Sequence, residues 1–272
     1  MNSSSGPLKE LVWLKDHLKD PQLIIVDCRY NLFDAHYGQR AYSNGHIPGA
    51  YFVDLLRDMT GQISKNGGRH PLPDIHLFAK KLESFGINET STVVAYDDNW
   101  SGAARFYFLM QYIGFENSYV LNGLYQNWEN LGYPTDKTEP RKRKGELRIR
   151  PDKHIRIEIN HLKKDIDSVK LVDCRSSDRY AGENETIDPV AGHIPGAVNH
   201  PFMESIGDRG YLDKSLLEKK FSDLPEDPIL YCGSGVTACV NFVAMRVAGK
   251  DPRVYCGSWS DWISYPENPV EK

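Results

Sequence analysis

Residues 45–50 of the sequence read GHIPGA, and the same six residues return unchanged at 192–197. Other stretches recur around them in the same order. LIIVDCR at 23–29 matches LVDCR at 171–175, and TVVAYDD at 92–98 matches PILYCGS at 228–234. An apolar helical stretch follows residue 98 and again residue 234, and NGLYQNW at 122–128 matches CGSWSDW at 256–262. Five matched features in the same order are far beyond chance. The sequence therefore predicts one domain that has been duplicated.

Each copy alternates helices with short apolar strands. An amphipathic helix is expected at 9–20 and again at 158–168, and each precedes a buried strand that ends in Asp-Cys-Arg. A loop then closes on the HIPG turn, and a helix, a strand, a second helix and a third strand follow. This order favours an α/β fold in which each domain is a mainly parallel sheet covered by helices on both faces.

The domain boundaries follow the composition of the chain. We expect an N-terminal domain at 1–138, a linker at 139–152 and a C-terminal domain at 153–272. The linker is charged and contains proline, which is typical of a segment that crosses the surface. Its RKRK run at 141–144 could also be a nucleic-acid patch, but a solvated linker is the favoured interpretation.

Composition excludes several classes of protein. The 272-residue chain has a net charge of −4, whereas nucleic-acid binding usually needs a basic face. No apolar run approaches the roughly 18 residues of a membrane span, and the N-terminus does not resemble a secretory signal. The five cysteines are odd in number and include no CxxC pair, which argues against a disulfide framework and a zinc site. We expect a cytoplasmic protein without membrane contact, nucleic-acid partner, metal or cofactor.

One cysteine stands in an unusual setting. Cys232 ends an apolar strand, at the edge where parallel α/β sheets bind ligands. Gly233 and Gly235 allow the following backbone to turn several N–H groups inward, and Thr237 lies where the next helix should begin. These features favour a thiolate, so they predict a cysteine nucleophile with a lowered pKa. The same loop would hold the anionic terminal sulfur of a persulfide.

The other four cysteines are expected to be packing residues: Cys28, Cys174, Cys239 and Cys256. Cys28 and Cys174 recur at matching places inside apolar strands. Cys232, in contrast, has Asp97 at the matching place in the first copy. A packing site would more readily keep a similar residue in both copies, so this difference supports a chemical role for Cys232.

With DCR and GHIPGA in each half and CGSGVT only in the second, the chain resembles the tandem-domain rhodanese-type sulfurtransferases over essentially its whole length. The resemblance implies two rhodanese-like domains, of which the first is inactive, with Asp97 at the cysteine position. The implied active loop is Cys232, Gly233, Ser234, Gly235, Val236 and Thr237. The implied reaction moves a sulfane sulfur from an anionic donor to Cys232, then to a thiol such as thioredoxin or glutathione, or to cyanide.

The resemblance also bears on the sulfur donor. Thiosulfate enzymes often carry basic residues inside the loop, whereas mercaptopyruvate enzymes typically carry the neutral pattern found here. Arg179 matches the first arginine that holds the mercaptopyruvate carboxylate. A second family arginine would fall near Thr186, with Glu185 and Ile187 as the neighbouring alternatives. We therefore expect a site with one arginine that uses both donors and prefers mercaptopyruvate only modestly.

A Ser/His/Asp relay has been proposed in the mercaptopyruvate subfamily. His70 matches its histidine and Ser234 its serine, while Leu56 occupies the place of the acid and Asp58 is a nearby substitute. A plain surface histidine is the alternative for His70. His46 and His193 recur in both HIPG turns, so we expect them to be structural.

Two other functions are weighed against sulfur transfer. A phosphatase or arsenate reductase on the same fold needs a Cys-x5-Arg loop, but Ala238 stands where that arginine would be. A non-catalytic module that binds proteins would not need Cys232, which is present. Both alternatives are therefore disfavoured.

Overall fold

The computed structural model of the protein describes residues 6–272, which form two compact units. The first contains residues 6–61 and 73–152, and the second contains residues 62–72 and 153–272. The two units do not simply follow one another along the sequence. The stretch 139–152 lies in the first unit, and segment 62–72 leaves the first half of the sequence to pack in the second unit.

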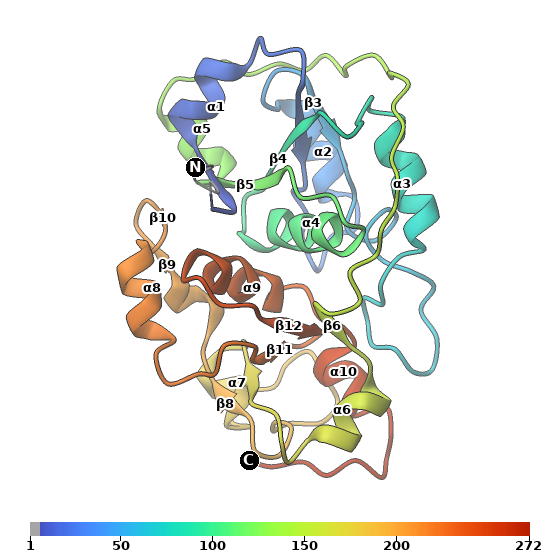
Figure 1. The fold of residues 1–272 in the computed structure, drawn as a ribbon, viewed down its shortest axis with the longest axis vertical. Coiled ribbons are helices and arrows are strands. Elements are labelled where there is room, and N and C mark those ends of the chain that lie inside the picture. The colour runs from blue at the N-terminus through green and yellow to red at the C-terminus, as the bar shows by residue number, and fades with distance from the viewer. Residues whose placement is uncertain (1–5) are drawn as a thin grey trace. The chain divides into compact units, whose positions relative to one another are not determined.

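The first unit is built on a five-stranded parallel sheet with the order β1-β5-β4-β2-β3 (Figure 1). Its strands are β1 (Leu8–Glu10), β2 (Leu23–Asp27), β3 (Ala50–Phe52), β4 (Thr92–Tyr96) and β5 (Ser118–Asn122). Its helices are α1 (Leu11–His17), α2 (Tyr37–Asn44), α3 (Ile75–Glu83), α4 (Ser101–Tyr112) and α5 (Tyr125–Asn130).

The second unit repeats this topology with the order β6-β12-β11-β7-β8. Its strands are β6 (Arg156–Ile157), β7 (Leu171–Asp173), β8 (Val198–Asn199), β11 (Ile229–Tyr231) and β12 (Arg253–Tyr255). Its helices are α6 (Ile159–Asp165), α7 (Ser177–Tyr180), α8 (Lys214–Lys220), α9 (Ala238–Val247) and α10 (Ser258–Trp262), with a 3-10 turn at Phe202–Ser205. A small antiparallel hairpin, β9 (Ile206–Gly207) with β10 (Gly210–Tyr211), is added. The predicted α/β fold of two duplicated domains, each built on a parallel sheet, is confirmed.

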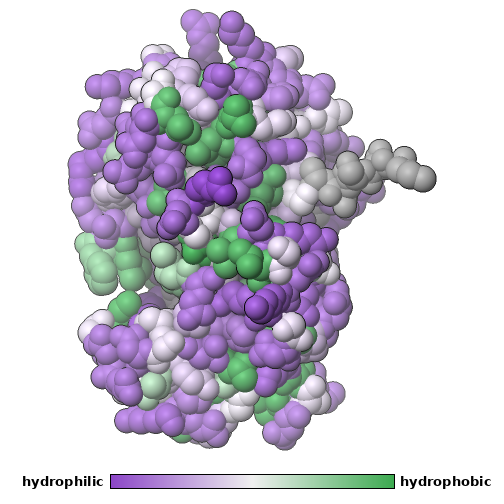
Figure 2. Space-filling model, turned by 90° about the vertical axis from the view of Figure 1, so that its left-hand side faces the viewer, coloured by the Kyte–Doolittle hydropathy of each residue, from purple (hydrophilic) through white to green (hydrophobic). Residues whose placement is uncertain are grey.

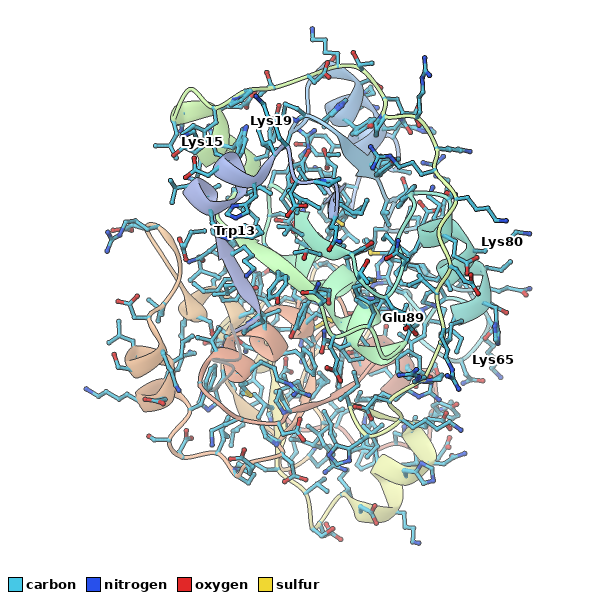
Figure 3. All side chains as sticks on the ribbon, turned by 45° about the horizontal axis from the view of Figure 1, so that its top comes forward. Trp13, Lys15, Lys19, Lys65, Lys80 and Glu89 are labelled. Carbon is cyan, nitrogen blue, oxygen red and sulfur yellow. The ribbon has the colours of Figure 1, made fainter. Side chains whose placement is uncertain are left out.

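Both predicted N-terminal helices are shorter than expected, and an edge strand precedes each. The helix predicted at 9–20 is wrong at its start: Leu8–Glu10 is β1, which pairs with β5, and α1 follows at Leu11–His17. In the second unit β6 likewise precedes α6, which spans Ile159–Asp165 rather than 158–168. In the first unit the Lys9 ammonium lies 4.6 Å from the ring of Trp13 and 4.1 Å from that of Tyr119, which ties β1 to β5; Figure 3 labels Trp13 and Lys15 on α1.

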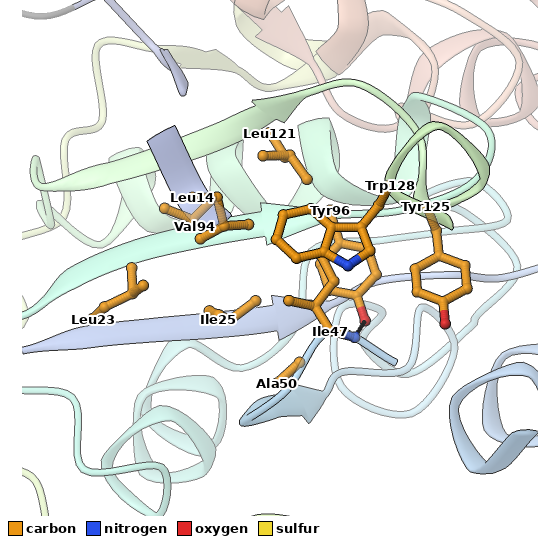
Figure 4. Packing of buried hydrophobic residues seen from close by; sticks show 10 residues of the cluster. All are labelled: Leu14, Leu23, Ile25, Ile47, Ala50, Val94, Tyr96, Leu121, Tyr125 and Trp128. Atoms are coloured by element: carbon orange, nitrogen blue, oxygen red, sulfur yellow. Dashed lines mark hydrogen bonds between the residues drawn. The ribbon is translucent and has the colours of Figure 1, made fainter. Parts of the chain in front are cut away.

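Period-two alternation of buried side chains gives the sheet of the first unit two apolar faces. Val94 and Tyr96 of β4 pack on one face with Leu14 of α1 and Trp128 of α5 (Figure 4). Val93 and Ala95, also buried, alternate with them and point to the opposite face. Burial on both faces explains why the central strands read as continuous apolar runs.

The repeated DCR and HIPG motifs hold each other in place. In the first unit Arg29 donates to both carboxylate oxygens of Asp27, and its Nη2 also donates to the Gly45 carbonyl oxygen at 2.7 Å. In the second unit Arg175 pairs with Asp173 in the same way and donates to the Gly192 carbonyl oxygen at 2.7 Å. Because both pairs are almost fully buried, removing one partner would cost about 3–5 kcal/mol.

A tyrosine at the end of the central strand completes this arrangement. The hydroxyl of Tyr96 donates to Asp27 at 2.7 Å and accepts from the backbone N–H of Ile47 at 3.1 Å, which is the dashed line in Figure 4. Tyr231 accepts from the N–H of Ile194 at 3.1 Å in the second unit. The repeated motifs therefore position the loops at the carboxyl edge of each sheet.

Hydrophilic side chains cover most of the face shown in Figure 2. Within residues 6–272 we find no helix with the length and apolar character needed to span a membrane. Cys28, Cys174, Cys239 and Cys256 are buried and form no disulfide within residues 6–272, in agreement with the packing role expected for them.

Candidate active site

Cys232 lies between β11 and α9 and is 1% exposed. The backbone N–H of Gly235 donates to its sulfur at 3.1 Å. Burial opposes ionisation, but the Thr237 side chain and the N–H groups of Ser234, Ala238 and Gly235 stabilise the thiolate, and the pKa of Cys232 is lowered from its ordinary value. The arrangement surrounds a buried sulfur with N–H and O–H donors that favour its thiolate form.

The loop needs glycine at position 235. Its φ of +78° lies in the left-handed region, and an added Cβ would collide with the carbonyl oxygen of Cys256. Trp259 and Ser260 of α10 donate backbone N–H groups to the carbonyl oxygens of Cys232 at 3.0 Å and Gly233 at 2.9 Å. The loop is thus fixed on the side opposite to its inward-facing N–H groups.

The first unit keeps the same cradle around a carboxylate. Asp97 accepts from the N–H groups of Asn99 at 3.3 Å, Trp100 at 2.9 Å and Ala103 at 2.8 Å. These donors are two, three and six residues after Asp97, the same spacing as Ser234, Gly235 and Ala238 after Cys232. Trp100 has φ +70° where the second unit has Gly235. The duplication therefore preserved the loop and its inward-facing N–H groups, with a carboxyl group in place of the thiol.

Arg179, on α7 of the second unit, extends to the loop that follows Cys232. Its Nε and Nη2 donate to the Glu185 carboxylate at 3.0 and 2.9 Å, and Nη2 also donates to Asp188 at 3.1 Å. Glu185 additionally accepts from Arg175 at 3.2 Å. The buried DCR motif thereby fixes the direction of Arg179, through a carboxylate whose side chain is 1% exposed.

Segment 62–72 brings two more side chains to this loop. Gly67 donates its backbone N–H to Asp261 at 2.6 Å, and Arg69 donates its own to the Ser260 hydroxyl at 3.1 Å. These bonds attach the segment to α10. As a result the Arg69 guanidinium pairs with the Asp188 carboxylate.

Two guanidinium groups therefore face the same glycine. A Cβ placed on Gly233 would lie 3.0 Å from Nη2 of Arg69 and 3.4 Å from Nη2 of Arg179. The sequence predicted one arginine at this site, whereas the structure places two beside the loop, and the second comes from segment 62–72 and not from the region of Thr186. Thr186 is exposed, and Glu185 already holds Arg179.

His70 lies beside the loop rather than on the surface. It is 4% exposed, and its Nδ1 is 2.8 Å from the Ser234 hydroxyl oxygen. The carboxylate of Asp58 is engaged within the first unit, where it pairs with Lys81 at 3.2 Å. Leu56 is 44% exposed. The structure thus brings His70 and Ser234 together.

The site contains a row of alternating charges: Asp173, Arg175, Glu185, Arg179, Asp188 and Arg69. Its three carboxylates balance its three guanidinium groups, so the row is neutral before the Cys232 thiolate is counted. Cys232, its loop, Arg179 and His70 were predicted from the sequence and lie together here, whereas Arg69, Glu185 and Asp188 were not predicted. The position of Arg69, directly before His70, was the one signal that could have found it.

Comparison with known proteins identifies the family. The model of the rhodanese-like domain matches residues 10–131 and again residues 158–265. The chain belongs to the rhodanese-like domain family. Both halves of this rhodanese chain match, in agreement with the duplication seen in its sequence and in its two sheets.

Relatives of the chain extend over nearly its whole length. It is 41% identical to the "Probable 3-mercaptopyruvate sulfurtransferase" of Pseudomonas aeruginosa, with 98% of each chain covered. It is 30% identical to the thiosulfate sulfurtransferase of Cricetulus griseus, covering 96% of this chain and 93% of the relative. The crystal structure of the 3-mercaptopyruvate sulfotransferase SseA from Escherichia coli matches with a TM-score of 0.82 at 26% identity, covering 94% of this chain and all of that one.

The rhodanese loop also bears on the rival functions. Ala238 is fully buried and donates its N–H toward Cys232, so the position that carries arginine in a Cys-x5-Arg loop is part of the thiolate cradle. The retained thiol with a lowered pKa is superfluous in a module that only binds proteins. Neither rival is favoured by the site or by the relatives.

Proposed function

We propose that the chain is a sulfurtransferase in which Cys232 carries the transferred sulfur as a persulfide. The observation that carries this proposal is a thiol stabilised as thiolate by the Thr237 side chain and the N–H groups of Ser234, Ala238 and Gly235, with two guanidinium groups beside its loop. Such a thiolate is a good nucleophile, and the neighbouring cations attract an anionic donor.

The chemistry balances for either class of donor. The Cys232 thiolate attacks the outer sulfur of thiosulfate, the S–S bond breaks, and sulfite leaves with its electron pair. With 3-mercaptopyruvate the thiolate attacks the thiol sulfur, the C–S bond breaks, and the enolate of pyruvate leaves. The thiol proton then moves to the enolate carbon, which gives pyruvate and the Cys232 persulfide anion.

The charge of the site favours the mercaptopyruvate donor. The row of paired charges is neutral and the thiolate adds one negative charge, so a monoanionic donor is repelled less than the thiosulfate dianion. Two guanidinium groups also suit a planar carboxylate, which accepts paired hydrogen bonds. We therefore expect a clear preference for 3-mercaptopyruvate, stronger than a one-arginine site would give.

The pair His70–Ser234 is suited to move the proton. Both side chains are nearly buried and hydrogen-bonded to each other at 2.8 Å. Ser234 lies within the loop, so its hydroxyl can donate to the departing enolate while the histidine ring supplies or takes up the proton.

A small thiolate completes the cycle by attacking the outer sulfur of the persulfide and regenerating the Cys232 thiolate. Glutathione and thioredoxin are acceptors of this chemical class, and cyanide reacts in the same way to give thiocyanate. Buried cysteines that form no disulfide within residues 6–272 suit a reducing, cytoplasmic compartment, where thiols stay reduced.

The test compares initial rates with 3-mercaptopyruvate and with thiosulfate, using one thiol acceptor. We expect kcat/KM to be higher with 3-mercaptopyruvate, and the Cys232→Ser variant to lose transfer from both donors. Equal transfer by Cys232→Ser would refute the persulfide mechanism. A preference for thiosulfate would refute the charge argument alone.

A further inference from the structure

We propose that Cys174 is a resolving thiol that discharges the Cys232 persulfide as hydrosulfide and leaves a disulfide between the two cysteines. This further activity, the release of sulfide without an external acceptor, rests on the proposed function, because Cys232 must first carry the sulfur. It gives Cys174 a chemical role in addition to packing.

The strand register places Cys174 directly beside Cys232. β7 and β11 pair in parallel, with Tyr231 opposite Asp173. One residue further along each strand, Cys232 stands opposite Cys174. The backbone N–H of Cys174 donates to the Tyr231 carbonyl oxygen at 2.8 Å, which continues the ladder to this pair. Neighbouring strands lie about 4.8 Å apart, and disulfides join residues whose Cα atoms are about 4.4–6.8 Å apart, so the backbone spacing suits a disulfide.

Both side chains point to the face of the sheet that α9 covers. Register partners in a parallel pair share a face, and successive residues along a strand alternate between the two faces. Tyr231 packs with Trp259 on one face. Cys174 and Cys232 therefore point to the other face, where α9 packs on β11 and β12 (Figure 1). Both cysteines are buried, so their sulfur atoms lie in the same layer between the sheet and α9.

The Cys174 thiol has a polar setting that a packing cysteine does not need. Burial raises the pKa of Cys174, the negative charge of the Cys232 thiolate raises it further, and a hydrogen bond with the Asn241 side chain opposes both effects. Asn241 is fully buried and is held by the Ser205 hydroxyl at 2.7 Å and the His200 carbonyl oxygen at 2.7 Å. Cys174 therefore stays a neutral thiol beside an anion and still has a proton to give as it reacts.

The first unit contains the same pair of positions without this chemistry. Cys28 stands opposite Asp97 in the register of β2 and β4, and it is also fully buried. Phe106 of α4 occupies the place that Asn241 has in α9. Cys28 therefore packs beside a carboxyl group, and it serves as a matched control for its counterpart in the second unit.

The proposed step balances without an added oxidant. The Cys174 sulfur attacks the inner sulfur of the persulfide, which is Sγ of Cys232, and an S–S bond forms between the two cysteines. The S–S bond to the outer sulfur breaks, and the outer sulfur leaves with the bonding electron pair. It takes up the thiol proton of Cys174 and departs as hydrosulfide, so one negative charge stands on each side of the reaction. The outer sulfur is reduced, the cysteines are oxidised to a disulfide, and a dithiol reductant reopens that disulfide by exchange.

The experiment loads the protein with 3-mercaptopyruvate or with thiosulfate, removes the donor and withholds any thiol acceptor. Intact mass and released hydrosulfide are then followed under anaerobic conditions. The parent protein should first gain one sulfur atom and then lose it, with one hydrosulfide released for each disulfide formed. Peptide mapping without reduction should join the peptides of Cys174 and Cys232. The rate should not depend on protein concentration, because both groups belong to one chain.

Three variants identify the resolving thiol. Cys174→Ala should keep its sulfur at least about tenfold longer than the parent protein, because only slower reactions between molecules remain. Cys28→Ala removes the matching buried thiol of the first unit and should discharge at the rate of the parent protein. Cys239→Ala should do the same, since the Cys239 thiol donates to the Gly235 carbonyl oxygen at 3.3 Å. Sulfur loading and thermal unfolding check each variant, and the peptide map of the parent protein tests the same claim without any substitution.

The possible failures are distinguishable. A loaded parent protein that keeps its sulfur as long as Cys174→Ala refutes the discharge and leaves the proposed function standing. A disulfide from Cys232 to Cys239, or sulfur mapped onto Cys174 itself, also overturns the role of Cys174 as resolving thiol. A parent protein that takes up no sulfur from either donor refutes the proposed function and the discharge with it.

Discussion

The Thr237→Val substitution probes the thiolate cradle with little change in side-chain shape. The Thr237 side chain is the first of the groups that offset burial and lower the pKa of Cys232, ahead of the N–H groups of Ser234, Ala238 and Gly235. Thr237 makes no side-chain cap bond to α9, so valine removes the hydroxyl without removing a helix cap. The backbone donors remain in place.

The magnitude follows from the charge on the sulfur. A hydrogen bond to a charged group contributes about 1.5–3 kcal/mol. Since about 1.4 kcal/mol moves a titration midpoint by one pH unit, the alkylation midpoint of Thr237→Val should rise by about one to two pH units. Reactivity should therefore be lost at neutral pH and recovered at alkaline pH, where the thiolate forms again.

The assay is the rate of iodoacetamide alkylation of Cys232 as a function of pH, followed by the mass of the modified protein. Thr237→Ser is the matched control, because it keeps the hydroxyl and should keep a midpoint near that of the parent protein. A Thr237→Val midpoint equal to that of the parent protein would refute the stabilisation of the thiolate by the Thr237 hydroxyl.

Three further predictions concern the loops and the arginines. Gly235→Ala should destabilise the protein by more than the roughly 1–2 kcal/mol that a left-handed conformation costs a residue other than glycine, because the added Cβ also collides with the Cys256 carbonyl oxygen. The control is Gly196→Ala, where φ is +74° but the added Cβ meets open space, and equal urea midpoints for the two variants would contradict the prediction. Burial, opposed by three N–H groups, raises the pKa of Asp97 to about 7, so stability should fall as the pH rises from about 4 to 7. The side chain at this position never ionises in the Asp97→Asn variant, so the free energy of unfolding of this variant should increase relative to that of the parent protein by on the order of 1–3 kcal/mol between pH 5 and pH 8. If the difference in free energy of unfolding, measured with urea, does not change with pH, the carboxylate of Asp97 is ionised throughout this range. Gly233→Ala should raise KM for 3-mercaptopyruvate without moving the alkylation midpoint, because the methyl group crowds Arg69 and Arg179, and an unchanged KM would place the donor elsewhere.

Local patterns in the sequence identified the nucleophile loop correctly in outline. The positions of Gly233, Gly235 and Thr237 after Cys232 describe a turn whose N–H groups face one atom, and this geometry depends on neighbouring residues only. The duplicated motifs also predicted the α/β class, because buried parallel strands leave continuous apolar runs. A short edge strand such as β1 carries too few residues to show a period, so residues 9 and 10 were read as helix.

The arginine pair could not be predicted in the same way. Arg69 and Asp188 are 119 residues apart, and their contact depends on segment 62–72 folding onto the second unit. Glu185 occupies the loop where a second arginine was sought, and it anchors Arg179 instead. Contacts of this kind depend on tertiary packing, which the spacing of residues along the chain does not reveal.

The most direct test of the account is the intact mass of the protein after incubation with 3-mercaptopyruvate and removal of excess donor. The parent protein should gain one sulfur atom, localised by peptide mapping to Cys232, and lose it again on addition of a thiol. Cys232→Ser should gain none, although Cys28, Cys174, Cys239 and Cys256 remain. Sulfur loaded onto any of these four cysteines, or onto Cys232→Ser, would contradict the central claim that Cys232 carries the transferred sulfur.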